Sequence, residues 1–186
     1  MSKLVLNKAQ HDQHIDDLNR RATIMALPVP ERLKSLTLHY MLAVDRLFNA
    51  RVSSNEIAVY PNGRYARKML ANGIVVVWLT SLSIANALNI DLGEMVDREV
   101  FESQKGDVYN MTSIDIVYDT VISDLVFGIS KMAQQAESFS MELDEHTKHD
   151  YGSNLAMVVN TLFRLIHEIG IDLVDEVSWF QVRRKD

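Results

Sequence analysis

Three cationic residues stand close together at the start of a predicted helix, where they could hold a phosphate group. Arg64 and Arg67 are about one helical turn apart, and Lys68 follows Arg64 at i, i+4. A helix N-terminus offers unpaired backbone N–H groups, and a guanidinium group binds phosphate oxygens in pairs. Tyr60 and Tyr65 flank these cations and could stack on a nucleobase. The pattern predicts a nucleotide-binding site, and a solvated helix start without a ligand is the alternative.

Acidic residues in a later predicted helix are the candidates for a metal site. Asp115 and Asp119 share one helical face at i, i+4, and Asp124 follows at a looser spacing. Mg²⁺ binds several oxygen ligands in a near-octahedral shell. The helix that should pair with this one lacks matching acids. Magnesium is therefore expected as a cofactor only if these acids converge with others in the fold.

The other reactive residue types form no recognisable catalytic motif. The chain has no cysteine, which excludes a thiolate zinc site and a cysteine nucleophile. Its sequence contains no phosphate-binding glycine loop and no Gly-x-Ser-x-Gly motif. The pairs His11/His14 and His146/His149 lack further ligands at matching spacing, and we expect them to be exposed polar residues.

The composition indicates an all-α chain that can bury a sizeable core. Hydrophobic residues make up 47% of 186 positions, and 7 glycines and 3 prolines are fewer turn residues than an all-β protein needs. The net charge of -6 gives no basic footprint for nucleic acid. The longest apolar run is far shorter than the ~18 residues of a membrane helix, so we expect no membrane span, no signal peptide and a cytoplasmic location.

Hydrophobic periodicity locates the helices that must position these residues. The first carries Ile15, Leu18 and Ala22 at i, i+3, i+7, and we expect this face to pack on the core. Apolar residues of the second helix cover more than one face, and the third is apolar almost all round and should be central. We expect Asn89 to end the third helix in a left-handed conformation and Asp91 to cap the next. The expected helices cover residues 9–27, 31–52, 64–88, a short segment from 91, 113–136, 151–169 and 172–184.

The order of these elements repeats along the chain. In each half a long helix, a polar loop, an apolar helix and a short capped helix follow one another, and Asn89-Ile-Asp-Leu92 aligns with Gly170-Ile-Asp-Leu173. We predict an N-terminal helix in residues 1–30 and two copies of a helical hairpin unit, 31–104 and 113–186, packed as one domain. Chance similarity is the alternative, because Ile-Asp-Leu is a common sequence after a helix stop.

The two aligned segments resemble the end of the MazG-like, all-α nucleoside triphosphate pyrophosphatase unit. Residues 162–177 join an apolar helix to Gly-Ile-Asp-Leu and a short helix, and residues 82–96 are the counterpart in the first half. The resemblance implies helical hairpins that assemble in dimers and magnesium-assisted hydrolysis at an acidic cluster that includes a Glu-x-x-Asp pair. The positions of that pair hold Gly73 and Val76 in the first half and Asn154 and Met157 in the second.

Three functions are compatible with these observations. Because the acidic positions of the family are not acidic here, we favour a non-catalytic MazG-like protein that binds a nucleotide or a protein partner through the polar end of the bundle. A magnesium-dependent nucleoside triphosphate pyrophosphatase is the first alternative, and a helical adaptor or inhibitor without a small-molecule site is the second. We expect no nucleic-acid or membrane partner, and a homo-oligomer is compatible with the paired hairpins that the resemblance implies.

Overall fold

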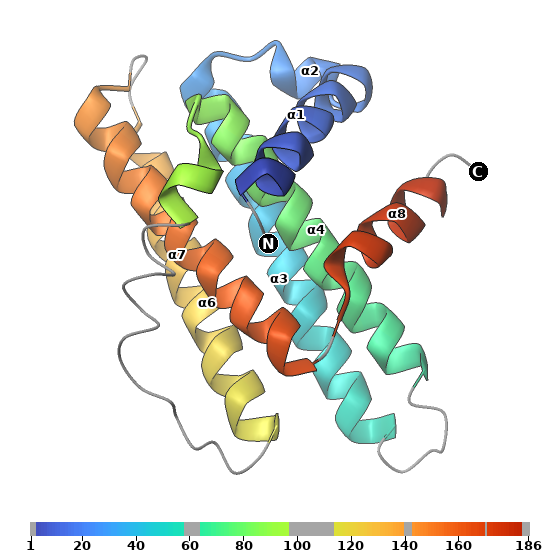
Figure 1. Cartoon of the computed structure of the whole chain (residues 1–186). Helices are drawn as coiled ribbons and strands as arrows, with labels where there is room; N and C mark the ends of the chain where they lie inside the picture. Colours follow the sequence, from blue (N-terminus) through green and yellow to red (C-terminus); the bar gives the residue numbers. More distant parts are fainter. Residues whose placement is uncertain (1–2, 58–63, 97–113, 140–142, 170, 184–186) are drawn as a thin grey trace.

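The computed structural model describes residues 3–57, 64–96, 114–139, 143–169 and 171–183. All regular structure in this part of the chain is helical (Figure 1), which confirms the predicted all-α class. The helices are α1 (Lys3–Arg20), α2 (Ala22–Met25), α3 (Val29–Ile57), α4 (Arg64–Leu88), α6 (Ile114–Glu137), α7 (Glu145–Ile169) and α8 (Leu173–Arg183), and residues 92–96 are also helical.

Four long helices form a closed bundle. Helix α3 packs on α4 and on α6, and α7 packs on α6 and on α4. Neighbouring helices run in opposite directions, so that α3 and α7 point one way and α4 and α6 the other (Figure 1). Helices α4 and α6 are therefore parallel and diagonal, which requires a long crossover between them, as in bundles with one such connection.

Helix α4 is the central helix, as its sequence predicts. Besides α3 and α7 it contacts α1 and α8. Ile74, Val75, Val77 and Trp78 are all buried, although consecutive residues of a helix point in different directions. Such all-round burial needs neighbours on every side, and the packing of four helices around α4 supplies them.

Helix α4 also satisfies a length and composition test for a membrane span over Lys68–Leu88. This stretch contains no long uninterrupted apolar run, because Asn72, Thr80 and Ser81 lie within it. In the structure 72% of the tested window is buried inside the bundle, which is typical of the core helix of a helical bundle. The predicted absence of a membrane partner stays a prediction.

Each sequential pair of helices contains one close approach at a glycine. A Cβ atom on Gly73 of α4 would lie 2.6 Å from Leu47 Cδ2 of α3, and one on Gly128 of α6 would lie 2.6 Å from Val158 Cγ2 of α7. Real Cβ atoms are not found that close to a neighbour, so a larger residue at either position would force the facing side chain to shift. The α3–α4 and α6–α7 pairings agree with the expected hairpins, while their origin by duplication stays a prediction.

The C-terminal turns of α4 and α7 are closed by the same kind of backbone hydrogen bond. Asn89 has a positive φ of 56°, and the next N–H, of Ile90, donates to the Ala85 carbonyl at 3.0 Å. After α7 the Ile171 N–H donates to the Ile166 carbonyl at 3.1 Å. These bonds close the C-terminal turns in the manner of a Schellman motif. The predicted left-handed end of the third helix is therefore confirmed.

The aspartates after these turns cap the helices that follow. Asp91 Oδ1 accepts from the Glu94 N–H at 3.3 Å. Asp172 Oδ1 accepts from the Val174 and Asp175 N–H groups at 3.0 and 3.2 Å. Each carboxylate satisfies N–H groups that have no partner within the helix, which confirms the predicted cap at Asp91.

The start of α7 lies six residues earlier than expected, at Glu145. Asp144 caps it, because its Oδ1 accepts from the Thr147 N–H at 2.6 Å. That hydrogen bond lowers the pKa of the Asp144 carboxyl. The first turns of α7 project beyond the core and carry polar residues only, so no apolar periodicity marks them in the sequence.

The prediction for the face of the first helix is wrong. Ile15 and Leu18 are 47% and 48% exposed, and Ala22 is exposed as well. The buried face of α1 instead contains Gln13 and Asp17, which are 2% and 0% exposed. The reason is that α1 packs on a part of α4 that offers hydroxyl, carboxamide and backbone groups, so hydrogen bonds replace apolar contacts there.

Candidate functional site

The predicted nucleotide site lies at the start of α4. The backbone of Arg64, Tyr65 and Arg67 is helical, as expected, but the side chains of these three residues and all of Tyr60 lie outside the described part of the chain. Lys68 is exposed. Whether these groups meet around a phosphate stays a prediction.

The predicted magnesium ligands lie on α6. Asp115 and Asp119 belong to its first turns, and their side chains lie outside the described residues. Asp124 is exposed. Within the described ranges, no three side chains of the metal-binding types gather closely enough to hold an ion. The condition set for magnesium, convergence of these acids with others, is therefore not met by any described group.

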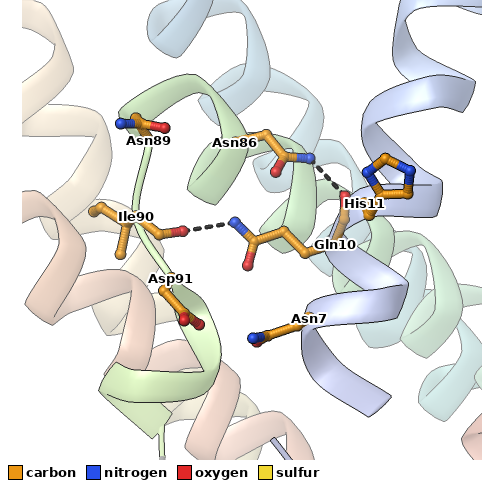
Figure 2. A pocket seen from close by; sticks show the side chains of 7 residues that line it. All are labelled: Asn7, Gln10, His11, Asn86, Asn89, Ile90 and Asp91. Atoms are coloured by element: carbon orange, nitrogen blue, oxygen red, sulfur yellow. Dashed lines mark hydrogen bonds between the residues drawn. The ribbon is translucent and has the colours of Figure 1, made fainter. Parts of the chain in front are cut away.

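A polar pocket of about 360 Å³ lies at the opposite end of α4, which sequence analysis did not single out. One wall comes from α1 and the other from the end of α4 and the turn after it, and Figure 2 shows the two sets of side chains across the opening. Most of these side chains are carboxamides. The carboxamide pocket is lined by Asn7, Gln10, His11, Asn86, Asn89, Ile90 and Asp91.

Gln10 holds the two walls of the carboxamide pocket together. Its Nε2 donates to the Ile90 carbonyl at 2.6 Å, and its Oε1 accepts from the Leu92 N–H at 3.2 Å. Asn86 Nδ2 donates to the backbone carbonyl of Gln10 at 3.0 Å. One side chain thus satisfies backbone groups on both sides of the turn that ends α4, and the turn cannot move away from α1 without losing these bonds (Figure 2).

A buried polar cluster lies further along the same α1–α4 interface. Gln13 Nε2 donates to Asp17 Oδ1 at 2.8 Å and lies 3.3 Å from Ser83 Oγ. Arg21 Nη1 lies 3.6 Å from Asp17 Oδ1 and donates to Ser83 Oγ at 3.4 Å. Burial raises the pKa of Asp17, and the hydrogen bonds from Ser83 and Gln13 and the Arg21 charge offset only part of that rise. The cluster fixes the register of α1 on α4.

A second candidate is an exposed apolar surface where α3 and α6 meet. Phe127 is 58% exposed and Leu38 57%, which is unusual for large apolar side chains in such numbers on adjoining helices. This surface, the α3–α6 face, consists of Leu38, Met41, Leu42, Val126 and Phe127.

A groove of about 210 Å³ lies between α3 and α6, and Met41 and Val126 belong both to its lining and to the α3–α6 face. Its lining is mostly apolar, with Asp45 as the one charged residue among the lining residues. Asp45 Oδ2 accepts from Asn49 Nδ2 at 3.0 Å on the same helix. On α6, Lys131 Nζ lies 4.6 Å from the centre of the Phe127 ring, a cation–π contact. The lining residues are Met41, Val44, Asp45, Val126, Ile129 and Ser130.

The sequence contained a signal for one of these surfaces and not for the other. The second predicted helix has apolar residues on more than one face, and a single core can cover only one broad stripe of it. The apolar residues of this helix that the core does not cover include Leu38, Met41 and Leu42, which lie exposed. The carboxamide pocket joins residues about 80 positions apart, and asparagine and glutamine carry no spacing that marks a site.

Comparison of the chain with models of known protein families, with curated proteins and with solved structures finds no match in any of the three.

Proposed function

We propose that this chain is a non-catalytic helical binding protein that recognises a partner protein through the α3–α6 face. The observation that supports the proposal is a set of five half-exposed apolar side chains on α3 and α6, two of which, Met41 and Val126, line one groove. Contiguous apolar surface of this kind usually marks an interaction site on a folded protein. The proposal keeps the partner-binding hypothesis but moves the binding surface from the polar end of the bundle to the exposed apolar side chains of α3 and α6.

The apolar side chains are spaced to receive a helix. Leu38, Met41 and Leu42 follow one another at i, i+3, i+4 along α3, and Val126 of α6 lines the same groove as Met41. Two neighbouring helices with a groove between them accept the apolar row of a third helix. Covering the exposed half of each side chain would contribute about 1 kcal/mol.

The charge of the groove favours a partner helix with a basic residue. Asp45 lines the groove and stays exposed at its edge, and Asp124 is exposed one turn before Phe127 on α6. A lysine or arginine beside the apolar row of the partner would meet Asp45, which speeds encounter and fixes orientation more than it adds affinity. The proposed occupant is therefore an amphipathic helix of a second protein with a basic flank.

Site-specific photo-crosslinking in the native host tests this proposal. A photoreactive phenylalanine analogue replaces Leu42 or Phe127, and an exposed residue of α2, Thr23, carries it as the matched control. We expect both face positions to link to the same protein, through a segment with an apolar helical row and a basic residue, and Thr23 to give no such product.

The other outcomes contradict the proposal. A product joining two copies of this chain would make the face a dimer interface. No product, or equal products from Thr23, would remove the face as a recognition surface. The magnesium-dependent pyrophosphatase alternative has its own test, since pyrophosphate release would have to be lost in Asp119→Asn and Asp124→Asn.

A further inference from the structure

We infer that Asp17 and Gln13 of α1 hold one proton between them, as a closed acid–carboxamide pair, and that the loss of this proton loosens α1 on α4. The inference concerns the α1–α4 interface and does not depend on the α3–α6 face. It rests on two buried oxygens without partners, on the charges around Asp17 and on the small apolar contact that α1 makes.

The two oxygens belong to one hydrogen-bonded pair. Gln13 Nε2 donates to Asp17 Oδ1 at 2.8 Å. The second oxygen of each group, Gln13 Oε1 and Asp17 Oδ2, is buried and has no hydrogen-bond partner in the part of the chain that the structure describes. A buried acceptor without a donor is costly. A proton on Oδ2 that is donated to Oε1 satisfies both atoms and closes a ring of two hydrogen bonds.

The surroundings of Asp17 favour this proton. The residue is 0% exposed, and Arg21 Nη1 lies 3.6 Å from its Oδ1 while also donating to Ser83 Oγ. A buried carboxylate with so loosely held a cation carries a large desolvation cost. Burial accordingly raises the pKa of Asp17, and the contacts with Ser83, Arg21 and Gln13 offset only part of the rise.

The helices that pack on α1 bring no other titratable group to this place. Helix α4 has none from Met69 to Leu88, and α2 has none at all. On α1 itself, Asp16 is bonded to Arg20 at 2.6 Å, and its charge adds to the rise of the Asp17 pKa. His14 precedes Asp17 by one turn and is partly buried, so the experiment includes a variant without its imidazole.

The position of α1 depends on this polar interface. Helix α1 packs on α4, with α2 beside it. Among the α1 side chains whose exposure the structure describes, Leu6 is the one buried apolar residue. An ionised Asp17 would lose its bond to Gln13 Oε1 and leave a charge in the interface, so α1 would separate from α4 more often. Gln10 would then also lose its bonds to the turn after α4.

Carboxyl and carboxamide ¹³C NMR of the unchanged chain detects the proton directly. The Cγ signal of Asp17 should pass from the protonated to the ionised form at a higher pH than that of Asp12, an exposed residue of the same helix. The Cδ signal of Gln13 should move at the same pH as Asp17, because its Oε1 loses the donated proton. Cδ of Gln10 is the matched control and should not follow, since its Oε1 accepts from the Leu92 N–H.

Amide hydrogen exchange in α1 measures the loosening. Asp17→Asn keeps both hydrogen bonds of the pair without a proton to lose, and comparison at equal pH cancels the chemical exchange rate. From about pH 4 to the pH at which Asp17 ionises, the opening constant of the unchanged chain relative to Asp17→Asn should rise about tenfold per pH unit and then level off. Asp12→Asn and His14→Gln should keep the rise of the unchanged chain.

Any of four results would overturn the inference. Asp17 could ionise at the same pH as Asp12, which is the result expected if water rather than a proton satisfies the two oxygens. The Gln13 Cδ signal could fail to follow Asp17, or exchange in Asp17→Asn could keep the pH dependence of the unchanged chain. Loss of the rise in His14→Gln would assign the effect to His14. The carbon signals require no substitution, so they decide the matter even if a variant fails to fold.

Discussion

The Tyr40 hydroxyl of α3 lies 2.6 Å from Ser81 Oγ of α4, and both residues are fully buried. Ser81 Oγ donates to the Val77 carbonyl at 2.8 Å, so Tyr40 is the donor in this pair. One turn earlier on α3, Thr37 Oγ1 donates to the Leu33 carbonyl at 2.7 Å and accepts from the Tyr151 hydroxyl of α7. In both pairs a tyrosine hydroxyl donates to a serine or threonine hydroxyl that itself donates to a carbonyl of its own helix. These two pairs join α3 to α4 and to α7.

Removal of the Tyr40 hydroxyl should weaken the α3–α4 contact by a small, measurable amount. Tyr40→Phe leaves Ser81 Oγ buried without its donor, and we expect the free energy of unfolding to fall by about 1–2 kcal/mol. Urea denaturation of Tyr40→Phe, Ser81→Ala and the double variant measures the coupling, which should be about 1 kcal/mol. Strictly additive losses would contradict a specific hydrogen bond.

The buried tyrosines predict a loss of stability in alkaline solution. Burial raises the pKa of Tyr40 and of Tyr151 above the ordinary value of 10.0. Above pH 10 the unfolded chain therefore releases these protons while the folded chain keeps them, so stability falls as pH rises, by about 1.4 kcal/mol per pH unit for each tyrosine.

Denaturation of Tyr40→Phe, Tyr151→Phe and the unchanged chain between pH 8 and 11 checks this expectation. Each variant should lose one tyrosine's share of the slope above pH 10. Equal slopes in all three proteins would show that neither hydroxyl keeps its proton in the folded state.

The Asp17 carboxyl predicts the pH dependence of the α1–α4 interface. Burial raises its pKa above the ordinary value of 3.8. The folded chain therefore holds the proton more tightly than the unfolded chain, and the stabilisation present below about pH 4 is lost as pH rises through the raised pKa. Asp17→Asn keeps the shape without the charge, so its stability relative to the unchanged chain should increase from pH 4 to pH 7.

Urea denaturation at pH 4, 5.5 and 7 measures that difference. Asp12→Asn, an exposed position on the same helix, is the control and should show no such trend. A relative stability of Asp17→Asn that stays constant or falls with pH would contradict a raised pKa at Asp17.

The positive φ at Asn89 predicts opposite effects of two small residues. Asn89→Gly should leave stability unchanged or raise it by about 0.5 kcal/mol, whereas Asn89→Ala should lower it by about 1 kcal/mol, because alanine is strained at φ 56°. Thermal unfolding followed by circular dichroism compares the two. Equal stability of the alanine and glycine variants would mean that the turn is not left-handed.

Sequence reasoning predicted the elements that follow local rules. The central α4, its end at Asn89 and the cap at Asp91 depend on periodicity and on turn chemistry within a few residues. The orientation of α1 could not be predicted in that way. Ile15 and Leu18 form the regular apolar pattern, yet Asp17 is buried, because the partners of α1 lie some 70 residues away on α4.

For the two candidate surfaces as well, local sequence patterns were predictable and contacts between distant segments were not. The surplus of apolar residues on α3 indicated that part of this helix is an exposed apolar surface. The residues of α6 that belong to the α3–α6 face could not be predicted, because they depend on how the helices pack in the bundle. The carboxamide pocket depends on Gln10 meeting the turn at Ile90, a contact between distant segments. Arg64 and Arg67 match a known pattern for binding phosphate, and the nucleotide site at the start of α4 stays a prediction.

The most direct test of the central claim measures the affinity of the crosslinked partner, once purified, for the unchanged chain and for Leu42→Lys with Phe127→Lys. Because both residues are exposed, the double variant should unfold within about 0.5 kcal/mol of the unchanged chain. Its affinity for the partner should fall by about 100-fold, since two apolar anchors are lost. A correctly folded double variant that binds the partner as tightly as the unchanged chain would contradict recognition through the α3–α6 face.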